Sequence, residues 1–227
     1  MALTLTLAPT VAHADSCDTH GCLAAYAEVF VLHRGAWPSF QPTTTAARPQ
    51  TIANGQFYRP SGTMEAVGVG VGTTFYTPYS VSVPFLGLRV GALTSTASYS
   101  SMIPADPQPV RYDFSTNALY ASFLLPGIGL SWFSDRVHLG IAAQPNFSLY
   151  GGKSASLTQG VIAQAVDTTG GTIFEVGTEA EACLAVGERR GRQWLCLVAG
   201  APLLRTDPLR AFDGATISLR FELTYPK

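Results

Sequence analysis

Apolar residues occupy every second position in several stretches of the chain, and the segment TIFEVGTEAEACLAVG at residues 172–187 shows this pattern well. Alternate positions would place phenylalanine, valine, alanine and leucine on one face. The other face would carry Glu175, Glu179 and Glu181. A period of two is typical of a β-strand, because successive side chains of a strand point to opposite sides. The segment therefore predicts a strand with one apolar face and one acidic face.

The same alternation recurs elsewhere. RVHLGIAAQPNFSLY at residues 136–150 places Arg136 and His138 on its polar face, and ATISLRFELTY at residues 215–225 does the same for Arg220 and Glu222. In VGVGVG at residues 67–72, valines alternate with glycines. We interpret these glycines as small residues that face a crowded interior and leave room for larger side chains. A nucleotide-binding glycine loop would need a helix after it, and none is predicted here.

Weaker alternation predicts strands over residues 23–34, 80–96, 114–133 and 192–204, with a bulge at Pro84 and a break near Pro126. The total is about eight strands, enough to close a small barrel. Long links are predicted over residues 35–62, 97–113, 151–171 and 205–213, and short ones at 77–79, 134–135 and 188–191. Because long and short links alternate, the long ones should lie at one end.

Composition favours lipid as the environment of the apolar faces. Only 13% of the residues are charged and 47% are hydrophobic, whereas roughly 25% of residues are charged in an average soluble domain. No stretch approaches the roughly 18 consecutive apolar residues of a membrane-spanning helix, so a closed β-barrel is the structure that could span. The formal net charge is −1 without a basic run, and we expect no nucleic-acid partner.

With these strands and links, residues 23–225 resemble the small eight-stranded outer-membrane proteins of the OmpA/OmpX type. The resemblance is one of architecture and rests on no sequence motif. It implies an all-β fold, an eight-stranded antiparallel up-and-down transmembrane β-barrel over residues 23–227 in the bacterial outer membrane. The partners expected are outer-membrane lipid and unidentified surface ligands of the long loops, and the barrel is expected to be a monomer. The role implied is non-enzymatic, either structural or adhesive, or that of a narrow gated pore.

The start of the chain has features of export. An apolar stretch is followed by Ala12-His13-Ala14, which fits cleavage after Ala14. We therefore predict a signal peptide at residues 1–14 and an N-terminal periplasmic segment at residues 15–22. An even number of cysteines, four, agrees with an oxidising compartment.

The four cysteines are Cys17, Cys22, Cys183 and Cys196. Cys183 and Cys196 lie symmetrically about a turn predicted at residues 189–190 and share the inward face, so we predict a disulfide between them. For CDTHGC, which also contains Asp18 and His20, a local disulfide or a flexible terminus is favoured over a metal site, because the spacing fits no familiar zinc pattern. We expect neither a metal nor a cofactor.

If the apolar faces meet lipid, the charged side chains of the strands point into the lumen. These residues are Arg89, Arg136, His138, Glu175, Glu179, Glu181, Arg220 and Glu222. Isolated charges there would be costly, so we expect a salt-bridge cluster centred on Glu179, Glu181, Arg89 and Arg220. A plug that only fills the barrel is favoured over an ion gate, because buried ionic networks need not be functional.

Two other functions stay open on the sequence. One is a lipid-modifying enzyme in which His138 acts with Ser148 or Ser218, although only geometry could establish such a site. The other is an exported soluble β-sandwich or lipocalin-like binder, whose apolar faces would surround a core and a ligand. For a membrane barrel, aromatic belts are expected from Tyr76, Trp132 and Tyr225 near the short turns and from Phe147 and Tyr150 near the long links.

Overall fold

The computed structural model describes residues 21–35, 61–103, 106–134, 136–159, 162–166, 171–186, 193–206, 209–210 and 214–226. The predicted signal peptide, most of the predicted periplasmic segment, Cys17, Asp18 and His20 lie outside these residues. The strands are β1 (Cys22–Gly35), β2 (Ser61–Tyr76), β3 (Val81–Ile103), β4 (Asp106–Leu124), β5 (Ile128–Phe133), β6 (Val137–Gln159), β7 (Ile162–Val166), β8 (Gly171–Ala185), β9 (Gln193–Thr206), β10 (Leu209–Arg210) and β11 (Gly214–Pro226). Within the described ranges there is no helix that is long and apolar enough to cross a membrane.

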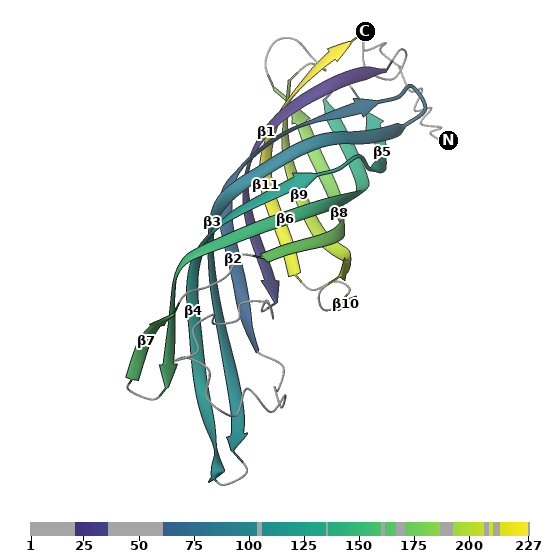
Figure 1. Cartoon of the computed structure of the whole chain (residues 1–227). Helices are drawn as coiled ribbons and strands as arrows, with labels where there is room; N and C mark the ends of the chain where they lie inside the picture. Colours follow the sequence, from purple (N-terminus) through teal and green to yellow (C-terminus); the bar gives the residue numbers. More distant parts are fainter. Residues whose placement is uncertain are drawn as a thin grey trace, which may run out of the picture.

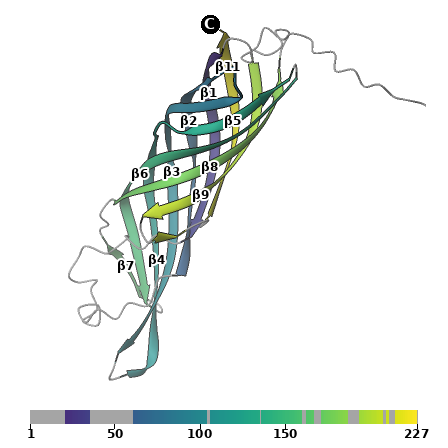
Figure 2. The ribbon, with the colours of Figure 1, turned by 90° about the vertical axis from the view of Figure 1, so that its right-hand side faces the viewer.

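Eight strands close into one ring (Figures 1 and 2). Around it, the order is β1, β2, β3, β4, β6, β8, β9 and β11, and every neighbouring pair is antiparallel. The seam joins the first strand to the last, from Cys22 opposite Pro226 to Arg34 opposite Gly214. The predicted eight-stranded antiparallel up-and-down barrel is therefore confirmed.

Two prolines interrupt the ring where the sequence indicates. β4 ends at Leu124, and β5 continues its path by pairing with β3 and β6, so β4 and β5 are two halves of one barrel strand. The break lies at Pro126, as predicted. Beside Pro84 the register of β2 and β3 shifts, because Thr73 pairs with Leu86 while Thr74 pairs with Pro84. Proline has no N–H to donate to the ladder, which explains both interruptions.

The links at 97–113 and 151–171 differ from the prediction. β3 and β4 stay paired from the ring up to Ile103 and Asp106, and they form a hairpin that projects beyond the barrel in Figure 1. β6 likewise continues to Gln159 and pairs with β7. Within the link predicted at residues 205–213, β10 pairs with the end of β9. Alternation of apolar and polar residues marks a strand that has one apolar face. It does not reveal hairpin arms that extend beyond the barrel and lack such a face.

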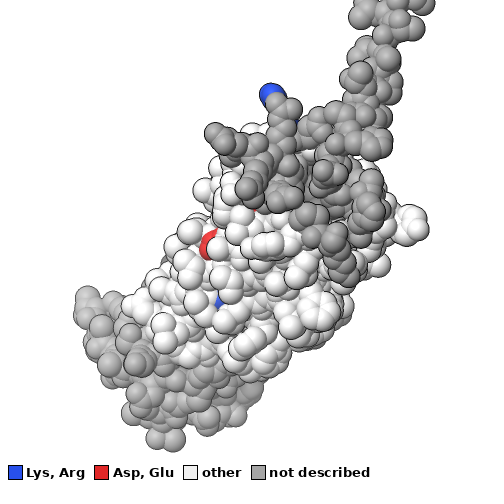
Figure 3. All heavy atoms as spheres, turned by 90° about the horizontal axis from the view of Figure 1, so that it is seen from above, with Lys and Arg blue, Asp and Glu red and all other residues white. Residues whose placement is uncertain are grey.

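The apolar faces of the strands point outward. Val29 on β1 lies between Val69 on β2 and Leu219 on β11, and these side chains are 57%, 56% and 54% exposed. The inward neighbours of Val29 are the buried residues Glu28 and Phe30. Figure 3 shows one face of the molecule, on which the described atoms belong almost entirely to uncharged residues. The barrel is thus apolar outside and polar inside.

Three of the five residues predicted for aromatic belts face outward. Trp132, Tyr225 and Phe147 are exposed on the outer surface, as a belt requires. Tyr76 and Tyr150 are buried, at 1% and 3% exposure, so their assignment to belts was wrong. Both occupy even-numbered positions, and the even-numbered residues of their strands point into the lumen. The position of a residue along its strand does not show whether its side chain faces outward or into the lumen.

Candidate functional site

The middle of the lumen contains a ring of buried ion pairs formed by Glu28, Arg89, Glu179 and Arg220. Nε of Arg89 lies 2.6 Å from Oε1 of Glu28, and its Nη2 lies 2.6 Å from Oε1 of Glu179. Nη2 of Arg220 lies 3.1 Å from Oε2 of Glu28 and 2.9 Å from Oε2 of Glu179. Each guanidinium therefore bridges the same two carboxylates, and the ring connects β1, β3, β8 and β11.

Strand register brings these side chains together. Glu28 lies directly opposite Arg220 on β11 and opposite Gly70 on β2, and Gly70 in turn lies opposite Arg89 on β3. A Cβ atom on Gly70 would come within 2.8 Å of Oε1 of Glu28 and 3.0 Å of Cγ of Arg89. The missing side chain thus leaves the space in which Arg89 reaches Glu28. For Gly70, this confirms the interpretation that the glycines of VGVGVG make room in a crowded interior.

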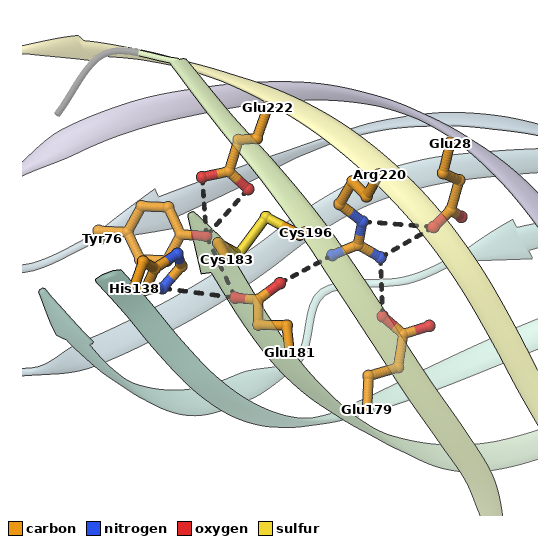
Figure 4. Close-up of a disulfide and its surroundings, with 9 residues drawn as sticks. All are labelled: Glu28, Tyr76, His138, Glu179, Glu181, Cys183, Cys196, Arg220 and Glu222. Carbon is orange, nitrogen blue, oxygen red and sulfur yellow. Dashed lines mark hydrogen bonds and ion pairs between the residues drawn. A yellow bond between two sulfur atoms is a disulfide. The ribbon is translucent and has the colours of Figure 1, made fainter. Parts of the chain in front are cut away.

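A second group lies next to this ring, toward the short turns (Figure 4). The Tyr76 hydroxyl is 3.2 and 3.1 Å from the two carboxyl oxygens of Glu222 and 3.4 Å from Oε1 of Glu181. Oε2 of Glu181 lies 3.1 Å from Nη1 of Arg220, which connects this group to the ion-pair ring. Nε2 of His138 lies 3.5 Å from Oε1 of Glu181. Glu222 and His138 are both 0% exposed.

Aromatic rings and a disulfide fill the lumen near the short turns. The His138 ring stacks on Phe133 with centroids 4.0 Å apart, and Trp194 packs edge-on against both rings. Cys183 and Cys196 are direct cross-strand partners on β8 and β9, and they form a disulfide (Figure 4). That predicted disulfide is therefore confirmed. The sulfur atoms are buried together with Trp194.

The cysteine at the start of β1 also bears on the predictions. Cys22 is fully buried beside Ala24 and Tyr76, and it is disulfide-bonded. The described part of the chain holds no group of three or more His, Cys, Asp or Glu residues that could bind a metal. Together with its disulfide, the burial of Cys22 leaves its sulfur no role as a metal ligand.

Toward the long hairpins a separate polar group fills the lumen. Nη2 of Arg34 and Nδ2 of Asn146 each lie 3.1 Å from Oε1 of Glu175. Between this group and the ion-pair ring, the rings of Phe30 and Tyr120 pack with centroids 6.0 Å apart. Three lumenal cavities lined by described residues measure 10–20 Å³ each. A volume of that size holds about one water molecule, so the side chains around these cavities leave little free space.

The structure places most of the predicted charges inside and corrects two expectations. Arg89 pairs with Glu179, and Arg220 pairs with both Glu179 and Glu181, with His138 and Glu222 beside them. Glu175 pairs with Arg34 instead, away from this cluster. Arg136 is exposed in the turn before β6, so its placement in the lumen was wrong. The strand begins one residue later than the alternation indicated, and a turn residue is free to face water.

Sequence reasoning did not identify Glu28, Arg34 or Tyr76 as members of the site. Glu28 and Arg34 lie on β1, where the outward residues from Leu23 to Val31 are leucine, alanine and valine. The same parity test applied to this strand would have placed both charges in the lumen. Tyr76 follows the even-numbered glycines of β2, and their inward direction was already the signal that it faces the interior.

His138 does not form a hydrogen-bonded pair with Ser148 or Ser218, the two serines considered on the sequence. Ser218 donates to Oε2 of Glu28 at 2.8 Å, and Ser148 donates to Ser122 at 3.0 Å. Among the described residues, neither ring nitrogen of His138 has a hydrogen-bond partner. The closed ring also contradicts the soluble sandwich, because the apolar faces do not pack against a second sheet. A lipocalin-like cavity is contradicted too, because the lumen is filled with ion pairs.

Comparison with known proteins gives likeness in fold alone. No family model matches the chain, and no curated protein matches it. Among solved structures, the attachment invasion locus protein Ail of Yersinia pestis is 8% identical with a TM-score of 0.35, and the match covers 90% of this chain and 97% of Ail. Its complex with the heparin analogue sucrose octasulfate gives a TM-score of 0.36 at the same identity and coverage.

The translocator domain of the autotransporter NalP from Neisseria meningitidis is 9% identical with a TM-score of 0.23, and the match covers 91% of this chain and 89% of that domain. At such identities and TM-scores these likenesses say nothing about what the protein binds. The barrel architecture rests on the strand pairing of the chain itself.

Proposed function

We propose that this chain is an integral protein of the bacterial outer membrane, a non-enzymatic monomeric barrel that holds surface hairpins and whose lumen is closed by ion pairs. The row of Val29, Val69 and Leu219 carries this proposal, since all three are more than half exposed while Glu28 and Arg220, on the same strands, are buried. A barrel in water would gain by the reverse arrangement. Lipid contact accounts for an apolar exterior around a charged interior.

The contents of the lumen support a closed barrel. Four strands are joined by the two arginines of the ion-pair ring, and the disulfide and aromatic rings fill the end near the short turns. An eight-stranded barrel is just wide enough for its own side chains to fill. A conducting state would require Arg220 to leave at least one of its three carboxylate partners, Glu28, Glu179 and Glu181. A narrow gated pore would thus depend on this residue.

The projecting hairpin supports a role in surface contact. β3 and β4 remain paired from Tyr99 opposite Tyr112 to Ile103 opposite Asp106, after the last pair with β2, which is Ser61 opposite Ser98. The seam places the start of β1 and the end of β11 at the other end of the barrel. In an outer-membrane barrel, long connections lie outside the cell and both termini of the barrel lie in the periplasm. The hairpin is then available to ligands of the cell surface.

Cell fractionation with protease treatment tests location and orientation. The protein should appear in the outer-membrane fraction, and a protease site inserted between Ile103 and Asp106 should be cleaved in intact cells. The same site inserted in the turn at residues 77–80 should be protected until the outer membrane is opened. Recovery of the protein in a soluble fraction, or cleavage at the two sites in the opposite order, would contradict the proposal.

Conductance across a planar bilayer tests closure of the lumen. We expect the wild-type barrel to conduct little and Arg220→Ala to raise the conductance, because the substitution removes the cation that joins three carboxylates. Arg136→Ala is the matched control, since Arg136 is exposed in a turn and should leave conductance unchanged. Equal conductance of wild type and Arg220→Ala would contradict closure of the lumen by this residue and would also count against an ion gate there.

A further inference from the structure

We propose that Glu181 and Glu222 form a proton-binding site inside the barrel, in which one proton is shared between the two carboxyl groups and the Tyr76 hydroxyl. This inference rests on the barrel proposed above, and it assigns a ligand, the proton, to the group between the ion-pair ring and the disulfide.

The contacts of Glu222 are the first observation. Its side chain is 0% exposed, and in the described part of the chain it has no ion-pair partner, only the hydroxyl of Tyr76 at 3.2 and 3.1 Å. A fully buried, ionised carboxylate without a cation is costly. Arg220 is the nearest cation on the same strand, and it already pairs with Glu28, Glu179 and Glu181.

The number of hydrogens is the second observation. The Tyr76 oxygen lies within 3.4 Å of three carboxyl oxygens, two of Glu222 and one of Glu181, yet a phenol has one hydrogen to donate. With both carboxyls ionised, two of these oxygens would face lone pairs of the phenol oxygen. With one proton added, one carboxyl donates to Tyr76 while Tyr76 donates to the other. Like charges this close favour that proton.

His138 supplies an independent observation. It is 0% exposed and its Nε2 points at Oε1 of Glu181 from 3.5 Å, but neither ring nitrogen makes a hydrogen bond among the described residues (Figure 4). A charged imidazolium would need acceptors for two N–H groups. Its ring instead stacks on Phe133 and meets Trp194 edge-on. The added proton is therefore better held by the carboxyl groups, where a phenol oxygen accepts it.

The surrounding charges leave the site acidic. The charged and titratable groups that face this region are Tyr26 and Glu28 from β1, Tyr76 from β2, Arg89 from β3, His138 from β6, Glu179 and Glu181 from β8, and Arg220 and Glu222 from β11. Four glutamates thus face two arginines. A cavity of 20 Å³ beside Glu181, Glu179 and Arg220 has room for about one water, through which a proton could reach Glu181.

Infrared spectroscopy of the refolded protein in lipid vesicles at pH 7 tests this site directly. The carbonyl stretch of a protonated carboxyl group should be present in the wild type and lost in Glu222→Gln, because Glu181 then ionises beside Arg220. In Glu181→Gln the band should persist at a shifted frequency, because Glu222 stays buried without a cation but loses the neighbouring acid. Glu179→Gln is the matched control and should keep the band, since Glu179 pairs with two arginines. Tyr76→Phe should keep the band at a shifted frequency.

The wild-type spectrum alone can overturn the proposal. Absence of the band at pH 7 would show that no carboxyl holds the proton, and persistence of the band in Glu222→Gln would place it elsewhere. An unchanged frequency in Glu181→Gln would show that Glu181 takes no part in the site. Folding of each sample is checked separately by its heat-dependent mobility on a gel. A wild type that shows no such shift would contradict the membrane barrel, whereas a folded wild type without the band would contradict the proton site only.

Discussion

Glu28 and Arg220 face each other across the seam at which the barrel closes. They are direct partners in the pairing of β1 with β11, and both Nε and Nη2 of Arg220 donate to Oε2 of Glu28, at 3.3 and 3.1 Å. The Arg220 guanidinium also lies over the ring of Tyr26, 4.0 Å from its centroid. Because the first strand contributes the acid and the last strand the base, this ion pair can form only when the two ends of the sheet have met.

Replacement of Arg220 by an uncharged residue should destabilise the barrel. Arg220→Met keeps an apolar stem over Tyr26 but leaves Glu28, Glu179 and Glu181 without the cation they share. Loss of one partner from a buried ion pair costs about 3–5 kcal/mol. We expect a decrease of that order in the free energy of unfolding, measured by urea titration of the barrel in detergent. Arg136→Met, in an exposed turn, should remain within about 0.5 kcal/mol of the wild type.

A methyl group at Gly70 should disturb the same ion pairs. The added Cβ would meet Oε1 of Glu28 at 2.8 Å, so the carboxylate must move away from Arg89. We expect Gly70→Ala to lower the free energy of unfolding by about 1–3 kcal/mol, the usual cost of overpacking. Gly151→Ala is the control, because a Cβ there meets nothing within 4 Å. Similar effects of the two substitutions would contradict the account of Gly70.

Loss of the disulfide between Cys183 and Cys196 should also lower stability. The bond joins residues 13 apart in sequence, and closure of a loop of about 15 residues contributes about 3 kcal/mol in the chain-entropy model. The double variant Cys183→Ala/Cys196→Ala should lose stability of that order without reductant. A reductant should destabilise the wild type more than this variant. Equal urea midpoints for wild type and variant, both oxidised, would show that the bond adds nothing.

His138 should not support lipid turnover. The ring is enclosed by Phe133, Tyr76 and Trp194, and its nitrogens have no hydrogen-bond partner among the described residues. In vesicles of phospholipid and lipid A, product release should equal that of empty vesicles and should not change in His138→Phe, which preserves ring stacking. Turnover that is present in the wild type and lost in His138→Phe would revive the enzyme hypothesis.

Sequence alternation predicted the fold and much of the lumen because a barrel wall with an apolar outer face and a polar inner face imposes a strict period of two. The inward direction of Glu175, Glu179 and Glu181 followed from one strand, and that of Arg220 and Glu222 from another. Parity gives the direction of a side chain but not its partner. The pairing of Glu175 with Arg34, and not with the central cluster, depends on the register of strands that are distant in sequence. The alternation of side-chain direction does not apply to turn residues such as Arg136.

The proposed membrane protein is a closed barrel with its apolar faces toward lipid. The measurement that tests it is the gel mobility of detergent-extracted membrane protein, with and without heating of the sample, together with fractionation of the envelope. A membrane barrel should migrate at a different position before heating and should be recovered with the outer membrane. A soluble protein with one unchanged mobility would contradict the account, because its valines and leucines would then have to face inward and its glutamates outward.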